Sequence, residues 1–156
     1  MIQDLSTYFK GDWKFERKIQ FAGSMALYAQ ANGDAILEKG EEENVLQYHE
    51  KGILKMAETQ HQHPFFRKYK YNITAEGLDI FFNDELTRNF NLYQQYILET
   101  ATNKLVPKEI HVCNKDLYEG DFSFTDAAHF IHTSVITGPL KNYIITSEYS
   151  KIDTLL

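Results

Sequence analysis

The sequence predicts an all-β protein, an antiparallel β-barrel of about 8–10 strands with a short N-terminal helix. Short apolar stretches alternate with polar residues at a period of two, which is typical of half-buried strands. Turn residues separate these stretches at intervals of about 8–12 residues. Aromatic residues make up 14% of the chain, and they favour strands. Because no repeat or linker interrupts the pattern, we expect one domain over residues 1–156.

The N-terminal part predicts a helix and then the most informative strand. Residues 3–10 have helical spacing of apolar side chains and end at a glycine, so they are expected to close one end of the barrel. In the strand over 13–20, Trp13, Phe15, Arg17 and Ile19 share one face. A cation on an apolar face is costly unless it is paired or hydrated. This face therefore predicts a partly polar interior.

The next strands are expected over 24–31, 35–39 and 44–58. The Asn32-Gly33 pair is a strong hairpin signal and is expected to join the first two. Gly52 is expected to form a bulge in the third. Within that third strand, Leu46, Tyr48 and Glu50 fall on one face.

The strand over 65–74 has the clearest alternation in the chain. Phe65, Arg67, Tyr69, Tyr71 and Ile73 share one face, which places a second arginine among aromatic residues. Residues 94–105 fit either a short helix or a loop over the barrel mouth. The remaining strands are expected at 78–82, 89–93, 107–113, 117–124, 129–137 and 143–149.

Several motifs resemble those of known small barrels. Gly11-x-Trp13 resembles the Gly-x-Trp element of the lipocalin and fatty-acid-binding (calycin) barrels. The chain also resembles an uncharacterised family of small lipocalin-like proteins of bacteria and fungi. The matching segments are Gly11-x-Trp13 with Arg17, Tyr48-x-Glu50-x-Gly52, His111-x-Cys113-x-x-Asp116-x-Tyr118 and Gly138-Pro139-x-Lys141-x-Tyr143.

This resemblance implies a lipocalin-like barrel but no particular activity. It also implies structural roles for Trp13 and for a basic residue. Trp13 would close one end of the barrel, next to a cation from the end of the last strand. Lys141 and Lys151 are the candidates for that cation.

Composition excludes several classes of function. A net charge of −6 argues against a nucleic-acid partner. No apolar stretch approaches the length of a membrane span, and the first residues do not resemble a secretory signal, so we expect a cytoplasmic protein. His61-x-His63 has the spacing of metal ligands, but no further ligands lie nearby, so no metal and no cofactor are expected. A homodimer is left open.

The polar residues on interior faces predict a binding cavity. Phenols and guanidinium groups among apolar walls suit a small, partly hydrophobic ligand, and an arginine suits an anionic head group on it. An internal Arg17–Glu50 ion pair is the alternative interpretation of the same faces. The predicted ligand-binding residues are Arg17, Tyr48, Glu50, Arg67, Tyr69, Tyr71, His111, Cys113, Tyr118 and Tyr143.

Two other functions fit the sequence. The first is a cofactor-independent enzyme, of isomerase or cyclase type, that uses His111, Glu50 or Asp116 for acid–base chemistry in the same cavity. Nucleophilic catalysis by a His111–Cys113 pair is a weaker interpretation than a histidine beside a buried thiol. The second function is a protein-interaction module, which predicts a filled interior and an exposed apolar patch.

Overall fold

The computed structural model describes residues 4–109, 111–113, 116–139 and 141–152, with 111–113 described by their backbone alone. A short helix and eleven strands follow one another along the chain. They are α1 (Leu5–Phe9), β1 (Gly11–Phe21), β2 (Leu27–Lys39), β3 (Val45–Met56), β4 (Gln62–Ile73), β5 (Gly77–Phe82), β6 (Leu92–Glu99), β7 (Lys104–Pro107), β8 (His111–Cys113), β9 (Asp116–Asp126), β10 (His129–Thr137) and β11 (Asn142–Lys151).

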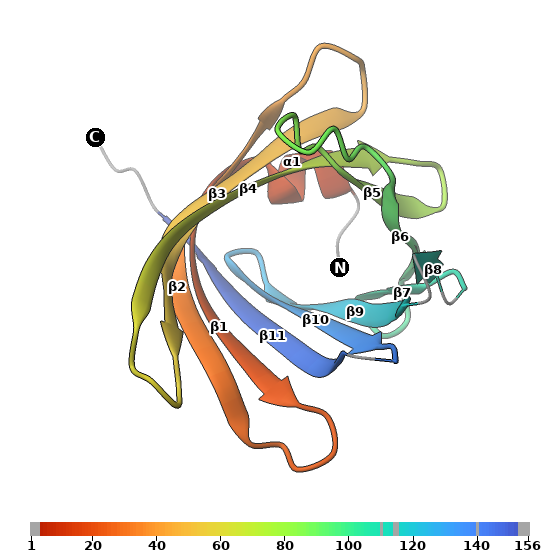
Figure 1. The fold of residues 1–156 in the computed structure, drawn as a ribbon. Helices are drawn as coiled ribbons and strands as arrows, with labels where there is room; N and C mark the ends of the chain where they lie inside the picture. The colour runs from red at the N-terminus through yellow and green to blue at the C-terminus, as the bar shows by residue number, and fades with distance from the viewer. Residues whose placement is uncertain (1–3, 110, 114–115, 140, 153–156) are drawn as a thin grey trace.

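The strands form one closed antiparallel barrel (Figure 1). Each strand from β1 to β6 pairs with the next, β7 pairs with β9, β11 pairs with β1, and β10 pairs with both β9 and β11. The short strands β7 and β8 pair with different parts of β9, so together they fill one position in a ten-strand barrel. The predicted fold class, an antiparallel barrel with a short N-terminal helix, is confirmed.

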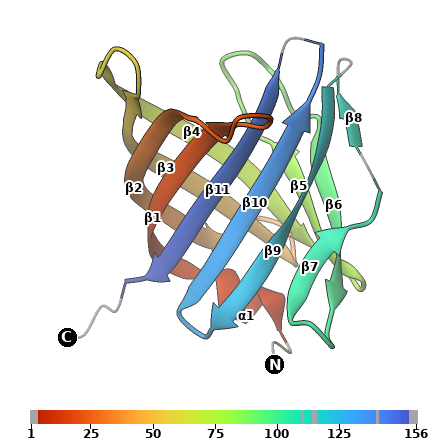
Figure 2. The same cartoon turned by 90° about the horizontal axis from the view of Figure 1, so that it is seen from below.

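Helix α1 lies at one end of the barrel, next to the turn between β9 and β10 (Figure 2). Asp4 caps it by accepting hydrogen bonds from the backbone N–H groups of Ser6 and Thr7. Phe9 at its end is fully buried and packs edge-on against Phe130. The helix therefore closes this end with aromatic side chains, and the connections at the opposite end surround the mouth of the barrel.

Trp13 completes the closed end. Its indole N–H donates to the Phe9 carbonyl oxygen over 2.8 Å, and its ring is fully buried. The cation at this ring is Lys151, whose Nζ lies 5.2 Å from the ring centroid. The prediction of Lys141 for this position is wrong, because Lys141 follows the β10–β11 turn at the mouth and Lys151 ends β11 beside Trp13.

Gly11 explains the first residue of the Gly-x-Trp element. Its φ angle of 137° lies in a region that favours glycine. A Cβ atom here would also approach the Lys151 side chain to 3.0 Å. The glycine thus lets β1 start directly beneath the lysine that covers Trp13.

The predicted hairpin at Asn32-Gly33 and the predicted bulge at Gly52 are wrong. Strand β2 runs unbroken through Asn32 and Gly33. In the continuous register between the two strands, Gly33 pairs with Gly52 of β3. A Cβ on Gly33 would lie 2.0 Å from the Lys51 carbonyl oxygen, so the two glycines allow a close approach of the two backbones. Here the pairing available on both sides of β2 overrides the local turn preference.

The interpretation of residues 94–105 as a helix or a mouth loop is also wrong. Residues up to Glu99 belong to β6, and β7 begins at Lys104 after a turn at the closed end. The register shifts between Ile80 and Phe81 of β5, which leaves Tyr93 unpaired as a bulge residue. This bulge interrupts the alternation that would have identified the strand, and it brings Tyr93 to the interior cavity.

Candidate functional site

A cavity of about 330 Å³ occupies the barrel above the aromatic closed end. It reaches the surface at Tyr28 and Lys141, both of which are exposed. Eight predicted ligand-binding residues line it: Arg17, Tyr48, Glu50, Arg67, Tyr69, Tyr71, Tyr118 and Tyr143. The sequence analysis thus identified a large share of the wall. The side chains of the other two, His111 and Cys113, lie outside the described residues.

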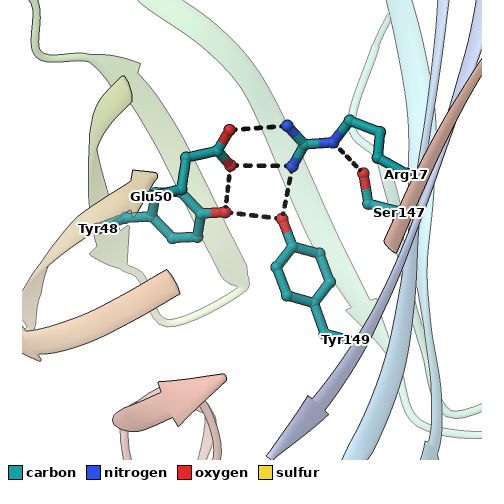
Figure 3. A network of polar contacts seen from close by, with 5 residues as sticks. All are labelled: Arg17, Tyr48, Glu50, Ser147 and Tyr149. Carbon is teal, nitrogen blue, oxygen red and sulfur yellow. Dashed lines mark hydrogen bonds and ion pairs between the residues drawn. The ribbon is translucent and has the colours of Figure 1, made fainter. Parts of the chain in front are cut away.

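A buried ion pair lies in the wall of the cavity, and Figure 3 shows its contacts. Arg17 Nη1 donates to Glu50 Oε2 over 2.7 Å, and Arg17 Nη2 donates to Glu50 Oε1 over 2.9 Å. The two side chains are only 13% and 2% exposed. Strand β1 supplies the arginine, on the inward face that the alternation of its sequence predicts, and β3 supplies the glutamate.

Two phenols and a hydroxyl complete this network. Arg17 also donates to Ser147 Oγ from Nε, over 2.7 Å, and to the Tyr149 hydroxyl from Nη2. Tyr48 donates to Glu50 Oε1 over 2.5 Å, which leaves its oxygen to accept from Tyr149 over 2.7 Å. Burial raises the pKa of Tyr149 to about 12, so this phenol keeps the proton that it donates.

The network holds Glu50 as a carboxylate. Burial by itself would raise the pKa of Glu50, but the hydrogen bonds and charge of Arg17 outweigh burial and leave the pKa below its ordinary value. The guanidinium is in turn neutralised by this carboxylate. The internal ion pair, given above as the alternative interpretation of Arg17, is therefore present.

Arg67 supplies a further cation to the cavity. It pairs with Glu50 in the β3–β4 register, and its side chain is exposed. No ion pair within 4 Å involves it among the described residues. Arg17 is the direct partner of Glu50, so Arg67 adds a further positive charge, which also acts on Glu50, Tyr69 and Asp84. Lys141 also lines the cavity, at the mouth, but it lies 3.9 Å from Asp116.

A second group of polar side chains, from β6 and β10, escaped the sequence analysis. The Tyr93 hydroxyl lies 2.8 Å from Ser134 Oγ, and the Tyr96 hydroxyl lies 3.1 Å from His132 Nε2. Burial lowers the pKa of His132 to about 3, so the imidazole is neutral at physiological pH. The alternation of Phe130, His132 and Ser134 along β10 was the available signal for this inward face.

Of the three predicted acid–base residues, Glu50 and Asp116 have described side chains and His111 does not. Glu50 is held in the ion pair, and Asp116 lies beside Lys141 without lining the cavity. Among the described residues, no group of three or more His, Cys, Asp or Glu side chains is placed to hold a metal ion. His61 and His63 form an exposed stacked pair at the start of β4.

A larger hollow of about 670 Å³ lies outside the barrel, over β1, β2, β3 and β11. Its wall is made of outward-facing polar and charged side chains, including Glu16, Lys18, Lys55 and Glu148. It lacks the aromatic lining of the interior cavity, and the two signs of charge are mixed along it. The interior cavity is therefore the candidate site.

Comparison with known proteins places this fold among other barrels. Residues 9–151 match the model of a family described as a family of unknown function, DUF6314. A search of curated protein sequences found no match. In the described residues, no helix is long and apolar enough to cross a membrane.

Three solved structures illustrate the likeness. The S-type phycobiliprotein lyase CPES from Guillardia theta has a TM-score of 0.61 at 8% identity, covering 96% of this chain and 92% of the lyase. The redesigned β-barrel mFAP1, solved bound to DFHBI, has a TM-score of 0.50 at 10% identity, with 94% and 97% covered. A DUF3598 protein of unknown function from Nostoc punctiforme has a TM-score of 0.57 at 6% identity, with 96% and 49% covered. At these identities the likeness is one of fold alone.

Proposed function

This chain belongs to the family of unknown function DUF6314, and we propose that its barrel cavity binds a small, partly hydrophobic ligand that carries an anionic group. The observation that carries the proposal is the excess of positive charge in an aromatic cavity. Glu50 is the one carboxylate among its described lining residues, and Arg17 already pairs with it. Arg67 is then available to an anion, through the two parallel hydrogen bonds that a guanidinium can donate.

The other walls support an amphipathic ligand. Phenol and phenyl rings, such as those of Tyr28, Tyr69 and Phe82, offer flat apolar surfaces for an organic body. A cavity with mostly apolar walls and a few fixed polar groups is the usual form of a small-molecule site. Two of the fold neighbours are a redesigned barrel solved bound to DFHBI and a phycobiliprotein lyase, and a cavity-containing barrel is consistent with such uses.

This proposal changes the expected role of Arg17. Its guanidinium donates to Glu50, Ser147 and Tyr149, so binding a ligand carboxylate there would require breaking a buried ion pair. We assign the anionic group of the ligand to Arg67 and a structural role to Arg17.

The experiment is a titration with the amphipathic anion 1-anilinonaphthalene-8-sulfonate, followed by fluorescence. We expect saturable binding to the wild type and binding at least about fivefold weaker to Arg67→Met, because one charge-assisted contact is lost. Lys68→Met is the matched control, because Lys68 is the neighbouring cation on the outer face, over the Phe66 ring. Near-ultraviolet circular dichroism of both variants checks that the fold is intact.

Equal affinity of the wild type and Arg67→Met would refute the assignment of the anion to Arg67. Absence of saturable binding, with the fold intact, would refute the binding cavity itself. A matching loss in Lys68→Met would show that the probe responds to overall charge and would also count against the assignment.

A further inference from the structure

His132 presents an unused polar atom to the cavity. Its Nε2 atom faces the Tyr96 hydroxyl at 3.1 Å and Ser134 Oγ at 3.5 Å. Its other ring nitrogen, Nδ1, has no hydrogen-bond partner among the described residues. Among the described residues, Gln94 Oε1 is the one side-chain nitrogen or oxygen that is both fully buried and without a hydrogen-bond partner. His132 Nδ1 also lacks a partner among these residues, so it cannot be fully buried and must border open space. Because His132 lines the cavity, that open space is the cavity.

The surrounding hydroxyls fix which nitrogen carries the proton. Burial raises the pKa of Tyr96 well above its ordinary value, so this phenol keeps its proton. Its hydroxyl has one hydrogen-bond partner among the described residues, His132 Nε2. If Nε2 carried the imidazole proton, the buried Tyr96 hydroxyl would have no acceptor, which is costly. Tyr96 therefore donates to Nε2, and the proton of the neutral ring lies on Nδ1.

Packing holds the ring in this orientation. The imidazole stacks on Phe122 with a centroid distance of 3.9 Å and an interplanar angle of 8°. Ser134, which is 6% exposed, is tied to Tyr93 over 2.8 Å and leaves little freedom on the Nε2 side. A 180° flip of the ring would keep the stacking but would replace Nε2 by a ring carbon and so lose the Tyr96 hydrogen bond. The Nδ1–H group is thus a fixed donor that faces the cavity without an acceptor.

We propose that His132 Nδ1–H donates a hydrogen bond to the ligand, which must carry an acceptor such as a carbonyl oxygen at that point. This inference rests on the proposed binding function and makes it more specific. The ligand class becomes an aromatic or alicyclic anion that also carries a neutral oxygen acceptor, with its charge at Arg67 and the acceptor at His132. A neutral imidazole suits a neutral acceptor, because it adds no charge beside the Arg17–Glu50 pair.

The first test is the tautomer of His132 in the wild type. Long-range proton–nitrogen correlation NMR distinguishes the two ring nitrogens without any ligand. We expect Nδ1 to carry the proton at neutral pH. A proton on Nε2, or a charged ring at pH 7, would overturn the inference, and this result needs no variant to fold.

The second test compares two probes of matched shape, 6-acetylnaphthalene-2-sulfonate and 6-ethylnaphthalene-2-sulfonate. Both carry the anion and the rings, but only the acetyl probe has an oxygen acceptor. We expect the wild type to prefer the acetyl probe by about fivefold to tenfold, which corresponds to one net hydrogen bond. His132→Phe should abolish that preference. His132→Asn should retain part of it, because its side-chain amide nitrogen lies close to the position of Nδ1.

The outcomes separate the two proposals. Equal binding of both probes to the wild type, or a preference that survives in His132→Phe, would overturn the role of His132 and leave the binding cavity in place. Binding of neither probe to the folded wild type would overturn the proposed function and this inference together.

Discussion

Replacing Glu50 by glutamine tests whether the Arg17–Glu50 pair supports the fold from within the cavity. The substitution keeps the shape of the side chain and removes its charge. Both partners are nearly inaccessible, at 2% and 13% exposure, so the guanidinium would lose its counter-ion in a poorly hydrated site. Removing one partner of such a pair costs about 3–5 kcal/mol. We expect the free energy of unfolding of Glu50→Gln to fall by about 3 kcal/mol.

Urea denaturation measures this loss, and a double-mutant cycle apportions it. Arg17→Met together with Glu50→Leu removes both charges, so we expect it to cost at least about 2 kcal/mol less than the sum of the two single changes. Glu148→Gln is the control, because Glu148 is exposed on the outer face of β11 and should change stability by less than about 0.5 kcal/mol. Additive single changes, or a loss below about 1 kcal/mol in Glu50→Gln, would refute this account of the pair.

The same pair predicts the pH dependence of stability. The pKa of Glu50 in the fold lies below its value in the unfolded chain, so the unfolded chain binds the proton more readily. The stabilisation is complete above the unfolded pKa of about 4.3 and is lost as the pH falls through the lower folded value. The loss of stability below about pH 4.3 should therefore be smaller in Glu50→Gln than in the wild type.

Three further predictions concern the close approach of β2 and β3 at Gly33, the closed end at Trp13 and the imidazole of His132. Gly33→Ala should lower the free energy of unfolding by about 1–3 kcal/mol, because its Cβ would lie against backbone; Gly23→Ala, where nothing lies within 4 Å of the added atom, should be near neutral in the same urea titration. Trp13→Phe should cost about 2–3 kcal/mol by losing ring volume and the hydrogen bond to Phe9, and an unchanged midpoint of thermal unfolding would contradict this. His132, with a pKa of about 3 in the fold, should stay neutral in an NMR titration down to about pH 4, and a midpoint near 6.5 would contradict its burial. Between about pH 6.5 and 3 the imidazole of His132 is protonated in the unfolded chain but not in the fold. The contribution of His132 to the free energy of unfolding should therefore be highest above about pH 6.5 and fall as the pH falls towards 3.

Where the side-chain pattern is regular, the sequence was enough to predict the inward face. Strand β1 alternates without interruption, so Arg17 was identified as an interior cation from its neighbours Phe15 and Ile19. The same reasoning placed Glu50 and Tyr48 on one face of β3 but could not decide which face was interior, because both faces mix polar and apolar residues. Whether Arg17 would pair with Glu50 or face a ligand could not be decided from the sequence, because the pair depends on β1 and β3 lying on either side of β2 in the barrel.

The failures have identifiable physical causes. Asn32-Gly33 has the composition of a turn. Only the structure shows that Gly33 instead allows the backbones of the paired strands β2 and β3 to approach closely at Gly52. The bulge at Tyr93 breaks the period of β6, so local pattern could not identify that strand. His132 was passed over because a lone histidine carries little information, and its hydroxyl partner Tyr96 comes from a distant strand.

A crystal structure of the protein with 1-anilinonaphthalene-8-sulfonate bound would test the central claim most directly. The account predicts the aromatic rings inside the barrel cavity and the sulfonate against the Arg67 guanidinium, with the Arg17–Glu50 pair unbroken. A probe seated in the outer hollow beside Lys18 and Lys55, or a sulfonate that displaces Glu50 from Arg17, would contradict it.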